Sequence, residues 1–325
     1  MGDEKFSTTL GPFGSCGDRF CLSGYREGHS VEERIKLASR IKILDGIELH
    51  YPMMFKEMSV GRAKELLQQG NLECSIVSVT VWSEMKWGRG SLTNPDSRVR
   101  TQAVEIIKKG MDIAKELGAS RINLWLGQDG FDYPFQVDYQ LLWNELIDGL
   151  KECAKHNPEI KICLEYKPKE PRSHLIIPTV GKALYTIEKV GFDNVGVNLD
   201  FGHAMMAFEN PAESAVLLNN ENRLFHLHFN DNYREFDWDM IAGSVHFWEL
   251  LEFLFWLQEI DYQGWYSLDI FPYREDPIGA CEMSIKNIKS TLKLLEKLDR
   301  KKVRQALKTH NYLQISSLVR QVIYE

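Results

Sequence analysis

The 325-residue sequence has no run of 18 apolar residues, so we expect no membrane-spanning helix. It also has no basic amino-terminal region followed by an apolar stretch, the pattern of a secretory signal. The formal net charge is −7, whereas nucleic-acid binding needs an excess of basic residues. We therefore predict a protein that binds neither membranes nor nucleic acids.

Two further patterns are missing. The six cysteines are scattered without CxxC spacing, which is typical of reduced thiols in a cytoplasmic protein. Neither of the phosphate-binding patterns GxGxxG and GxxxxGK[ST] follows a predicted strand, which disfavours an open nucleotide-binding sheet and a phosphorylated ligand. We therefore predict a cytoplasmic protein whose ligand carries no phosphate.

The sequence does contain a regular alternation of short apolar segments with longer amphipathic ones. The apolar segments have the length and composition of strands. They cover residues 20–23, 46–50, 74–81, 122–126, 161–166, 195–200, 224–229 and 265–270. Strands that alternate with helices form parallel sheets, and eight such units favour a closed α/β barrel, the (β/α)8 TIM barrel.

The segments between the predicted strands have apolar residues at helical spacing. Ser30 and Glu33 form a capping-box pattern, which predicts that a helix begins there. Further helices are predicted at 96–117, 138–156, 179–190, 211–218, 247–259 and 278–298. The charged, helical residues 299–325 follow the last of these. We therefore assign residues 1–298 to the barrel and 299–325 to a short C-terminal helical extension.

Residues that commonly bind metal ions stand at the ends of four predicted strands. These residues are Glu165, Asp200, His226 or His228, and Asp269. In a barrel of parallel strands the carboxyl ends meet at one mouth, so we expect these side chains to lie together. The two histidines share one strand face, and their spacing does not decide between them.

Each candidate also has a purely structural interpretation. Lys167 could form an ion pair with Glu165, Asp200 could cap a helix that exposes His203, and Asp269 could cap the helix that follows. The pattern DWD at 237–239 is common in solvated turns. If the set is genuine, carboxylates and imidazoles without thiolates favour Mg²⁺ or Mn²⁺, with Co²⁺ as a substitute and zinc less suitable.

Longer motifs between residues 45 and 276 resemble the xylose isomerase family and its relatives, the rhamnose isomerases and ketose 3-epimerases. The motifs are EYKPKEPR at 165–172, GVNLDFGH at 196–203, and LFHLHFN at 224–230 followed by DWD at 237–239. The resemblance implies a metal-dependent enzyme that acts on a monosaccharide. It also implies a homo-oligomer, a dimer or tetramer, although the C-terminal arm is shorter than in xylose isomerases.

The resemblance also implies roles for individual residues. One metal ion would be held by Glu165, Asp200, His228 and Asp269, and a second by Asp200, His203, Asp237 and Asp239. Lys167 would polarise a substrate oxygen and His50 would assist opening of the sugar ring, so the implied catalytic residues are Lys167, His50, Glu165 and Asp237. The implied substrate-binding residues are His50, Trp125, Lys167, His203 and Arg234.

Three departures from xylose isomerases argue against D-xylose as the substrate. His228 stands where those enzymes have Asp, and Phe271 stands where they have Lys. His50 is followed by Tyr51-Pro52 instead of the acidic residues that usually partner this histidine.

The expected activity is aldose–ketose isomerisation by a two-metal hydride shift. The first alternative is a ketose 3-epimerase with one metal and two carboxylate bases, favoured by the position of Arg234. The second is a non-catalytic, metal-stabilised barrel that binds sugar.

Overall fold

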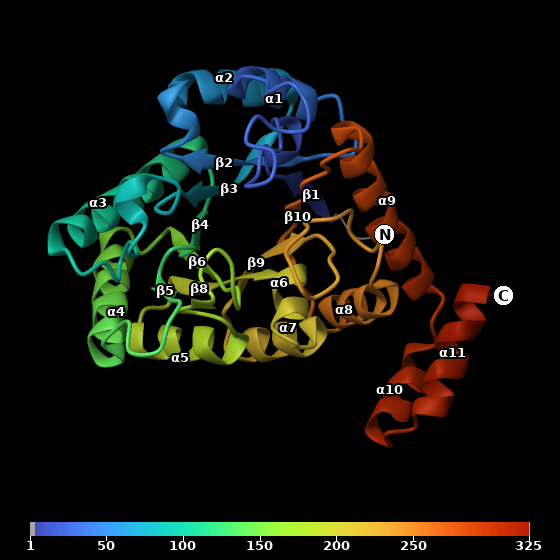
Figure 1. Ribbon diagram of the computed structural model, residues 1–325. Coiled ribbons are helices and arrows are strands. Elements are labelled where there is room, and N and C mark those ends of the chain that lie inside the picture. Colours follow the sequence, from blue (N-terminus) through green and yellow to red (C-terminus); the bar gives the residue numbers. More distant parts are fainter. Residues whose placement is uncertain (1–3, 325) are drawn as a thin grey trace.

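The computed structural model describes residues 4–324 and contains a closed barrel of parallel strands (Figure 1). The barrel strands are β1 (Lys5–Thr8), β2 (Gly46–Tyr51), β3 (Glu73–Val79), β4 (Arg121–Trp125), β6 (Lys161–Glu165), β8 (Val195–Asp200), β9 (Leu224–Phe229) and β10 (Trp265–Leu268). Strand β1 pairs with both β2 and β10 and so closes the barrel. The predicted (β/α)8 TIM barrel is confirmed.

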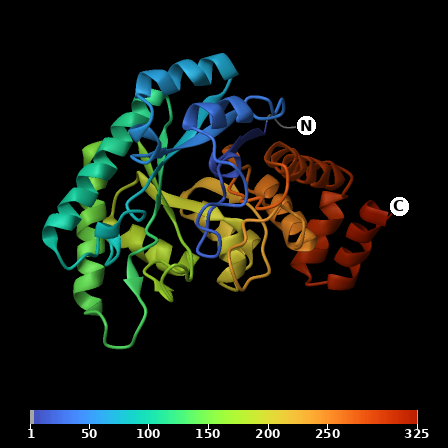
Figure 2. The same cartoon turned by 45° about the horizontal axis from the view of Figure 1, so that its top comes forward.

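Helices surround the barrel, as the views in Figures 1 and 2 show. They are α1 (Val31–Ala38), α2 (Val60–Gly70), α3 (Ser97–Leu117), α4 (Tyr139–His156), α5 (Val180–Val190), α7 (Pro211–Asn220), α8 (Phe247–Glu259) and α9 (Pro277–Glu296). Their ends follow local sequence signals. The predicted capping box of Ser30 and Glu33 begins α1, and Gly118 ends α3 with a positive φ of 82° that glycine adopts without strain.

The prediction of the first strand at residues 20–23 is wrong. Phe20 and Leu22 lie in the loop after β1 and are 73% and 88% exposed. The true β1 is hard to recognise because part of it is polar: the hydroxyl group of Ser7 donates to that of Ser267 at 2.8 Å inside the barrel. Only Phe6 gives β1 a large buried apolar side chain, so the strand lacks the apolar run that marks the others.

Short elements shape the loops at the carboxyl ends of the strands. They are η1 (Gly11–Phe13), η2 (Met54–Lys56), η3 (Met85–Trp87), α6 (Phe201–Met206), and the antiparallel pair β5 (Gly130–Phe131) and β7 (His174–Leu175). Asp129, just before β5, is buried and accepts hydrogen bonds from the backbone and hydroxyl groups of Ser91 and Thr93. These contacts join the loops that follow β3 and β4.

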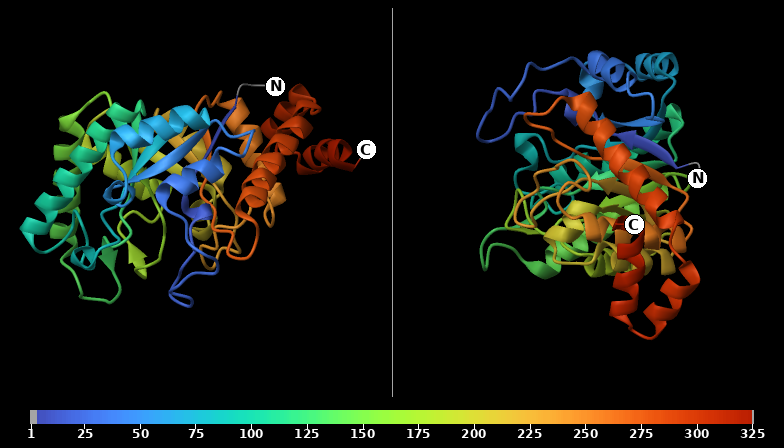
Figure 3. Two further views of the ribbon diagram at one scale, coloured as in Figure 1. Left: turned by 90° about the horizontal axis from the view of Figure 1, so that it is seen from above. Right: turned by 90° about the vertical axis from the view of Figure 1, so that its right-hand side faces the viewer.

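Helices α10 (Arg300–Lys308) and α11 (Tyr312–Tyr324) follow α9 and lie at one side of the barrel (Figure 3). Arg300 and Arg304 form ion pairs with Glu259 of α8. The division into 1–298 and 299–325 stays a prediction, and residues 1–3 and 325 lie outside the described range. Within 4–324, no helix combines the length and apolar character that crossing a membrane requires.

Candidate active site

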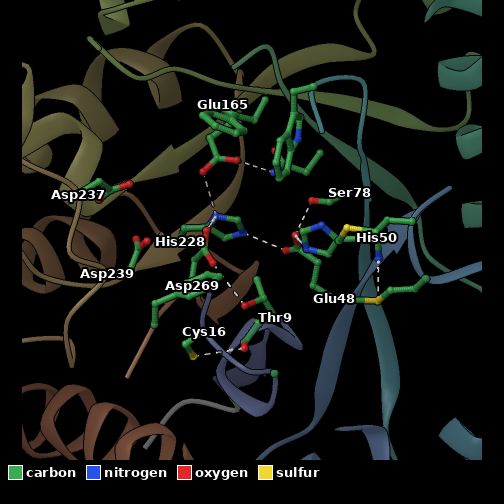
Figure 4. A pocket seen from close by; sticks show the side chains of 18 of the residues that line it. Thr9, Cys16, Glu48, His50, Ser78, Glu165, His228, Asp237, Asp239 and Asp269 are labelled. Carbon is green, nitrogen blue, oxygen red and sulfur yellow. Dashed lines mark hydrogen bonds and ion pairs between the residues drawn. The ribbon is translucent and has the colours of Figure 1, made fainter. Parts of the chain in front are cut away.

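Four predicted ligands meet at the carboxyl ends of the barrel strands. Three of them, Glu165, His228 and Asp269, are labelled in Figure 4. Glu165 ends β6, Asp200 ends β8, His228 lies in β9, and Asp269 directly follows β10. One donor atom of each residue lies within 4.8 Å of the donor atoms of the other three. Nδ1 of His228 is 3.2 Å from Oε1 of Glu165 and 3.5 Å from Oδ2 of Asp269. We call these four residues the strand cluster.

The strand cluster concentrates negative charge in a buried place. Burial raises the pKa of Asp200 to about 7 and that of Asp269 to about 6. Burial also opposes the charge of Glu165, but the neighbouring His228 outweighs it and lowers the pKa of that carboxyl group. Three carboxylates around one imidazole fit a hard divalent cation, which would supply the missing positive charge.

A second group of donors lies beside the strand cluster. Its members, which we call the loop cluster, are His203 of α6 and Asp237 and Asp239 of the β9–α8 loop. Oδ2 of Asp237 accepts from Nζ of Lys167 at 2.8 Å and lies 2.9 Å from Nε2 of His203. The buried atoms Nδ1 of His203 and Oδ1 of Asp237 have no hydrogen-bond partner among the described residues. Buried polar atoms without a partner are costly, and as metal-ligand atoms these two would fit a second cation.

Charge neighbours shift the protonation of the loop cluster strongly. Burial opposes a charge on His203, but Asp200 and Asp237 outweigh it and raise the pKa of His203 to about 9. Burial likewise opposes the charge of Asp237, whereas Lys167 and His203 hold the pKa of Asp237 far below its usual range. The pKa of Asp239 is raised by burial and by the adjacent Asp237. The negative charge of the loop cluster therefore lies on Asp237, between Lys167 and His203.

Both clusters face a cavity of about 340 Å³, within the size range of small-molecule sites. One side of the cavity is aromatic, because the rings of Trp82 and Trp125 lie 5.0 Å apart in an edge-to-face arrangement. Nζ of Lys167 lies 5.4 Å from the centre of the Trp125 ring. His50 also lines the cavity. The cavity thus brings cation ligands, a lysine, a histidine and an apolar wall together.

Glu48 is a site residue that the sequence reasoning missed. It stands two positions before His50 on β2, and it is only 1% exposed. Its Oε2 lies 2.9 Å from Nε2 of His228, and its Oε1 lies 3.4 Å from Nε2 of His50. The sequence after His50 offers no acidic partner, because Tyr51 and Pro52 stand there. Alternation along a strand places residues i and i+2 on one face, and this signal could have identified Glu48.

Burial opposes the charge of Glu48, yet His228 and His50 hold its pKa well below the usual range. Asn123 is a second missed residue: its Nδ2 donates to Oε2 of Glu165 at 2.5 Å, and its Oδ1 accepts from Asn198. Both residues hold ligand side chains from inside the barrel, where interior polar residues carry no distinctive motif.

The structure separates the remaining candidates. His226 is fully buried, and neither of its ring nitrogens has a hydrogen-bond partner among the described residues. His228, not His226, therefore joins the strand cluster, although His226 comes close enough to Glu48 and His228 to form a second possible metal group. Arg234 is not among the residues that line the cavity, because its Nη2 donates to Oε1 of Glu249 at 2.8 Å.

Comparison with known proteins places the chain in a family. Residues 35–298 match the xylose isomerase-like TIM barrel family, so the chain belongs to it and the predicted resemblance is confirmed. The chain is 27% identical over 238 residues to a xylose isomerase of Thermus thermophilus. That match covers 70% of this chain but only 61% of the relative.

Solved structures of similar fold carry the names of epimerases. A D-allulose 3-epimerase from Methylomonas sp. has a TM-score of 0.68 and 19% identity, covering 89% of this chain and 97% of that one. A D-tagatose 3-epimerase-like protein has a TM-score of 0.66 and 21% identity, covering 90% and 98%. At these identities the likeness concerns the fold.

Proposed function

We propose that this member of the xylose isomerase-like TIM barrel family is a metal-dependent aldose–ketose isomerase of an unphosphorylated monosaccharide. The observation that carries the proposal is the loop cluster, which sets His203 and Asp237 beside an already complete strand cluster. Epimerisation with one cation would leave these additional buried donors without a purpose. The 27% identity to a protein named xylose isomerase supports the same choice.

The residues present fit two cations of the Mn²⁺ or Mg²⁺ type. The strand cluster would hold one, and the loop cluster would hold the other together with Asp200. Bound divalent cations polarise sugar oxygens and stabilise the negative charge that develops on them during reaction.

The chain's own side chains would bind and orient the sugar. Nδ1 of His50 is buried without a partner among the described residues and lines the cavity, so it can accept the proton of a ring hydroxyl group. Nζ of Lys167 is anchored by Asp237 and can donate to a carbonyl oxygen. The aromatic wall of Trp82 and Trp125 covers the carbon skeleton and excludes water.

With the sugar held in this way, the overall change is an internal redox reaction. The hydrogen on C2 moves with its electron pair to C1, and the hydroxyl proton of O2 ends on O1. The aldose is thereby converted into a ketose without an external oxidant or reductant. Cytoplasmic location and a dimer or tetramer stay predictions.

A ketose 3-epimerase is the second candidate. It is favoured by the strand cluster alone, because Glu165 and Asp269 are two carboxylates at one cavity and could act as bases. This reaction inverts C3 and leaves the carbonyl group in place. A sugar-binding barrel without activity is the third candidate.

Product analysis separates the three candidates. The purified protein is incubated with Mn²⁺ and a panel of aldoses and ketoses, with EDTA-treated samples as controls, and the products are identified by NMR spectroscopy. We expect aldose–ketose interconversion that EDTA abolishes. Inversion at C3 alone would establish the epimerase, and sugar binding without turnover would establish the binding barrel.

The substitution Asp237→Asn tests the loop cluster directly. It removes a charge that holds Lys167 and His203, and we expect kcat to fall by at least about 100-fold, as for the loss of other preorganised charge-stabilising groups. Glu235→Gln is the matched control, because Glu235 lies in the same loop but is exposed. A near wild-type rate in Asp237→Asn would contradict the two-metal isomerase.

A further inference from the structure

One carboxylate contacts two functional imidazoles at once. Glu48 lies 2.9 Å from Nε2 of His228 through Oε2 and 3.4 Å from Nε2 of His50 through Oε1 (Figure 4). The hydroxyl group of Ser78 donates to the same Oε1. The two histidines have different surroundings, since His228 belongs to the strand cluster whereas His50 lines the cavity. Glu48 thus stands between the cation site and the sugar-facing histidine.

An ionised carboxylate accepts hydrogen bonds and donates none. The nitrogen that faces Glu48 is Nε2 in each ring, at hydrogen-bond distance in His228 and 3.4 Å away in His50, so an N–H group at Nε2 suits the carboxylate in both cases. When one ring nitrogen of a neutral histidine carries the proton, the other has a free electron pair. For His228 the other nitrogen is Nδ1, which lies 3.2 Å from Glu165 and 3.5 Å from Asp269 inside the strand cluster. Without a cation this nitrogen can donate a proton to Glu165, and a bound cation would take the place of that proton.

For His50 the free nitrogen is also Nδ1, the buried atom that has no partner among the described residues. A single buried carboxylate is thus placed to favour the same tautomer in both rings. One ring offers its electron pair to a cation, and the other offers its electron pair to the substrate.

We propose that Glu48 is a positioning residue that fixes the Nε2–H tautomer of both His228 and His50. It thereby prepares His228 as a cation ligand and His50 as a proton acceptor. Only the role of His50 rests on the proposed isomerase activity. The orientation of His228 requires no more than a bound cation.

The strand geometry makes this shared contact possible. Glu48 and His50 alternate on β2 with Ile47 and Leu49, which are fully buried, and so they share one face of the strand. The pairing of β2 with β3 shifts register between Ile47 and Glu48. On β3, Ser78 pairs with His50 and also reaches Glu48, so the carboxylate is satisfied on both oxygens.

The first test reads the tautomers without turnover. Protein labelled with ¹⁵N-histidine and loaded with diamagnetic Mg²⁺ is studied at pH 8 by ¹H–¹⁵N correlation NMR, with signals assigned by His50→Gln and His228→Gln variants. We expect His50 as the neutral Nε2–H tautomer and His228 with a proton on Nε2 alone. A proton on Nδ1 of neutral His50, or on Nδ1 of Mg²⁺-loaded His228, would overturn the proposal.

The second test uses Glu48→Gln, whose amide has one accepting atom where the carboxylate has two. We expect Mn²⁺ affinity to fall by about 10- to 100-fold, as for other outer partners of histidine ligands, and at least one ring to change tautomer. Glu209→Gln is the matched control, since Glu209 is a partly buried carboxylate that accepts from Tyr166 and Val180 and contacts neither histidine. Thermal unfolding of both variants measures how much the loss of a buried carboxylate charge lowers the stability of the folded protein.

Unchanged Mn²⁺ affinity and unchanged tautomers in a folded Glu48→Gln protein would overturn the proposal. If that variant does not fold, the tautomers of the unsubstituted protein decide alone. Neither the tautomers nor the Mn²⁺ affinity requires a sugar, so the positioning role of Glu48 can be tested even if isomerase activity is absent. Where activity is present, we expect Glu48→Gln to lower kcat more than it raises KM, because a positioning residue acts on proton transfer.

Discussion

The strand cluster and the loop cluster use similar ligands but are supported differently. The strand cluster projects from β6, β8, β9 and the end of β10, whose backbones are hydrogen-bonded to one another around the barrel. The aspartates of the loop cluster project from a loop whose base is closed by a two-way backbone pair between Asp231 and Met240. The side chain of Asp231 further accepts from the backbone of Val245 and His246.

The comparison teaches that one cavity can combine a site fixed by the barrel with a site fixed by side-chain contacts. Lys167 and His203 hold Asp237, and Asn230 connects the clusters by donating to Asp200 at 2.9 Å and to Asp239 at 3.2 Å. The cation affinity of the strand cluster should therefore depend mainly on its own ligands. The cation affinity of the loop cluster should also fall when the side chains that hold its ligands are changed.

The largest effect is expected from Glu165→Gln, which removes a ligand of the strand cluster. Mn²⁺ affinity should fall by more than about 100-fold, because outer partners of metal ligands alone are worth about 10- to 100-fold. Mn²⁺ titration followed by electron paramagnetic resonance measures it. Glu159→Gln, an exposed site just before the same strand, is the control. Retained affinity would show that the strand cluster is not a cation site.

A pH series should show protons competing with cations for the ligand atoms of both clusters. Affinity increases with pH until each ligand has lost its proton, by up to about tenfold per pH unit for each proton displaced. The pKa values of about 6 for Asp269 and about 7 for Asp200 make this rise steepest below pH 7. A shallower rise should continue above pH 7 at both clusters, because, despite burial, Glu165 and Glu48 raise the pKa of His228 well above its usual range, and Asp200 and Asp237 raise that of His203 to about 9. Mn²⁺ titrations from pH 5.5 to 9.5 that show no rise would contradict proton competition at these ligands.

The smallest effect is expected from Asn230→Ala, which removes the link between the clusters. The affinity of the loop cluster should fall by about tenfold, while that of the strand cluster changes less, because the barrel still holds Asp200. Two-site analysis of Mn²⁺ binding measures both. Asn144→Ala, on the exposed face of α4, is the control. An equal loss at both sites would mean that the clusters are not supported independently.

The strand cluster was predictable because two regularities coincide in it. Glu165, Asp200 and Asp269 each stand where an apolar segment stops, and parallel strands bring such points together. Alternation alone could not choose between His226 and His228, because it places both on the same strand face; the choice of His228 came from the family resemblance.

Other features depended on contacts that no local pattern records. Strand β1 has only one large apolar side chain, because its Ser7 faces Ser267 across the barrel. Glu48 contacts residues 30 and 180 positions away in the sequence. The position of Arg234 resembles that of a substrate-binding arginine in the ketose 3-epimerases, but here Arg234 donates to Glu249 on α8.

The closure of the barrel by β1 and β10 has a consequence for biosynthesis. Thr9 donates its backbone N–H to Leu268 at 3.0 Å and its hydroxyl group to Asp269 at 3.3 Å, so the first strand supports the last member of the strand cluster. A nascent chain that has not yet left the ribosome beyond β9 has three of the four strand-cluster residues and an open sheet. All four strand-cluster ligands can therefore bind a cation together only after strand β10 and Asp269 have left the ribosome.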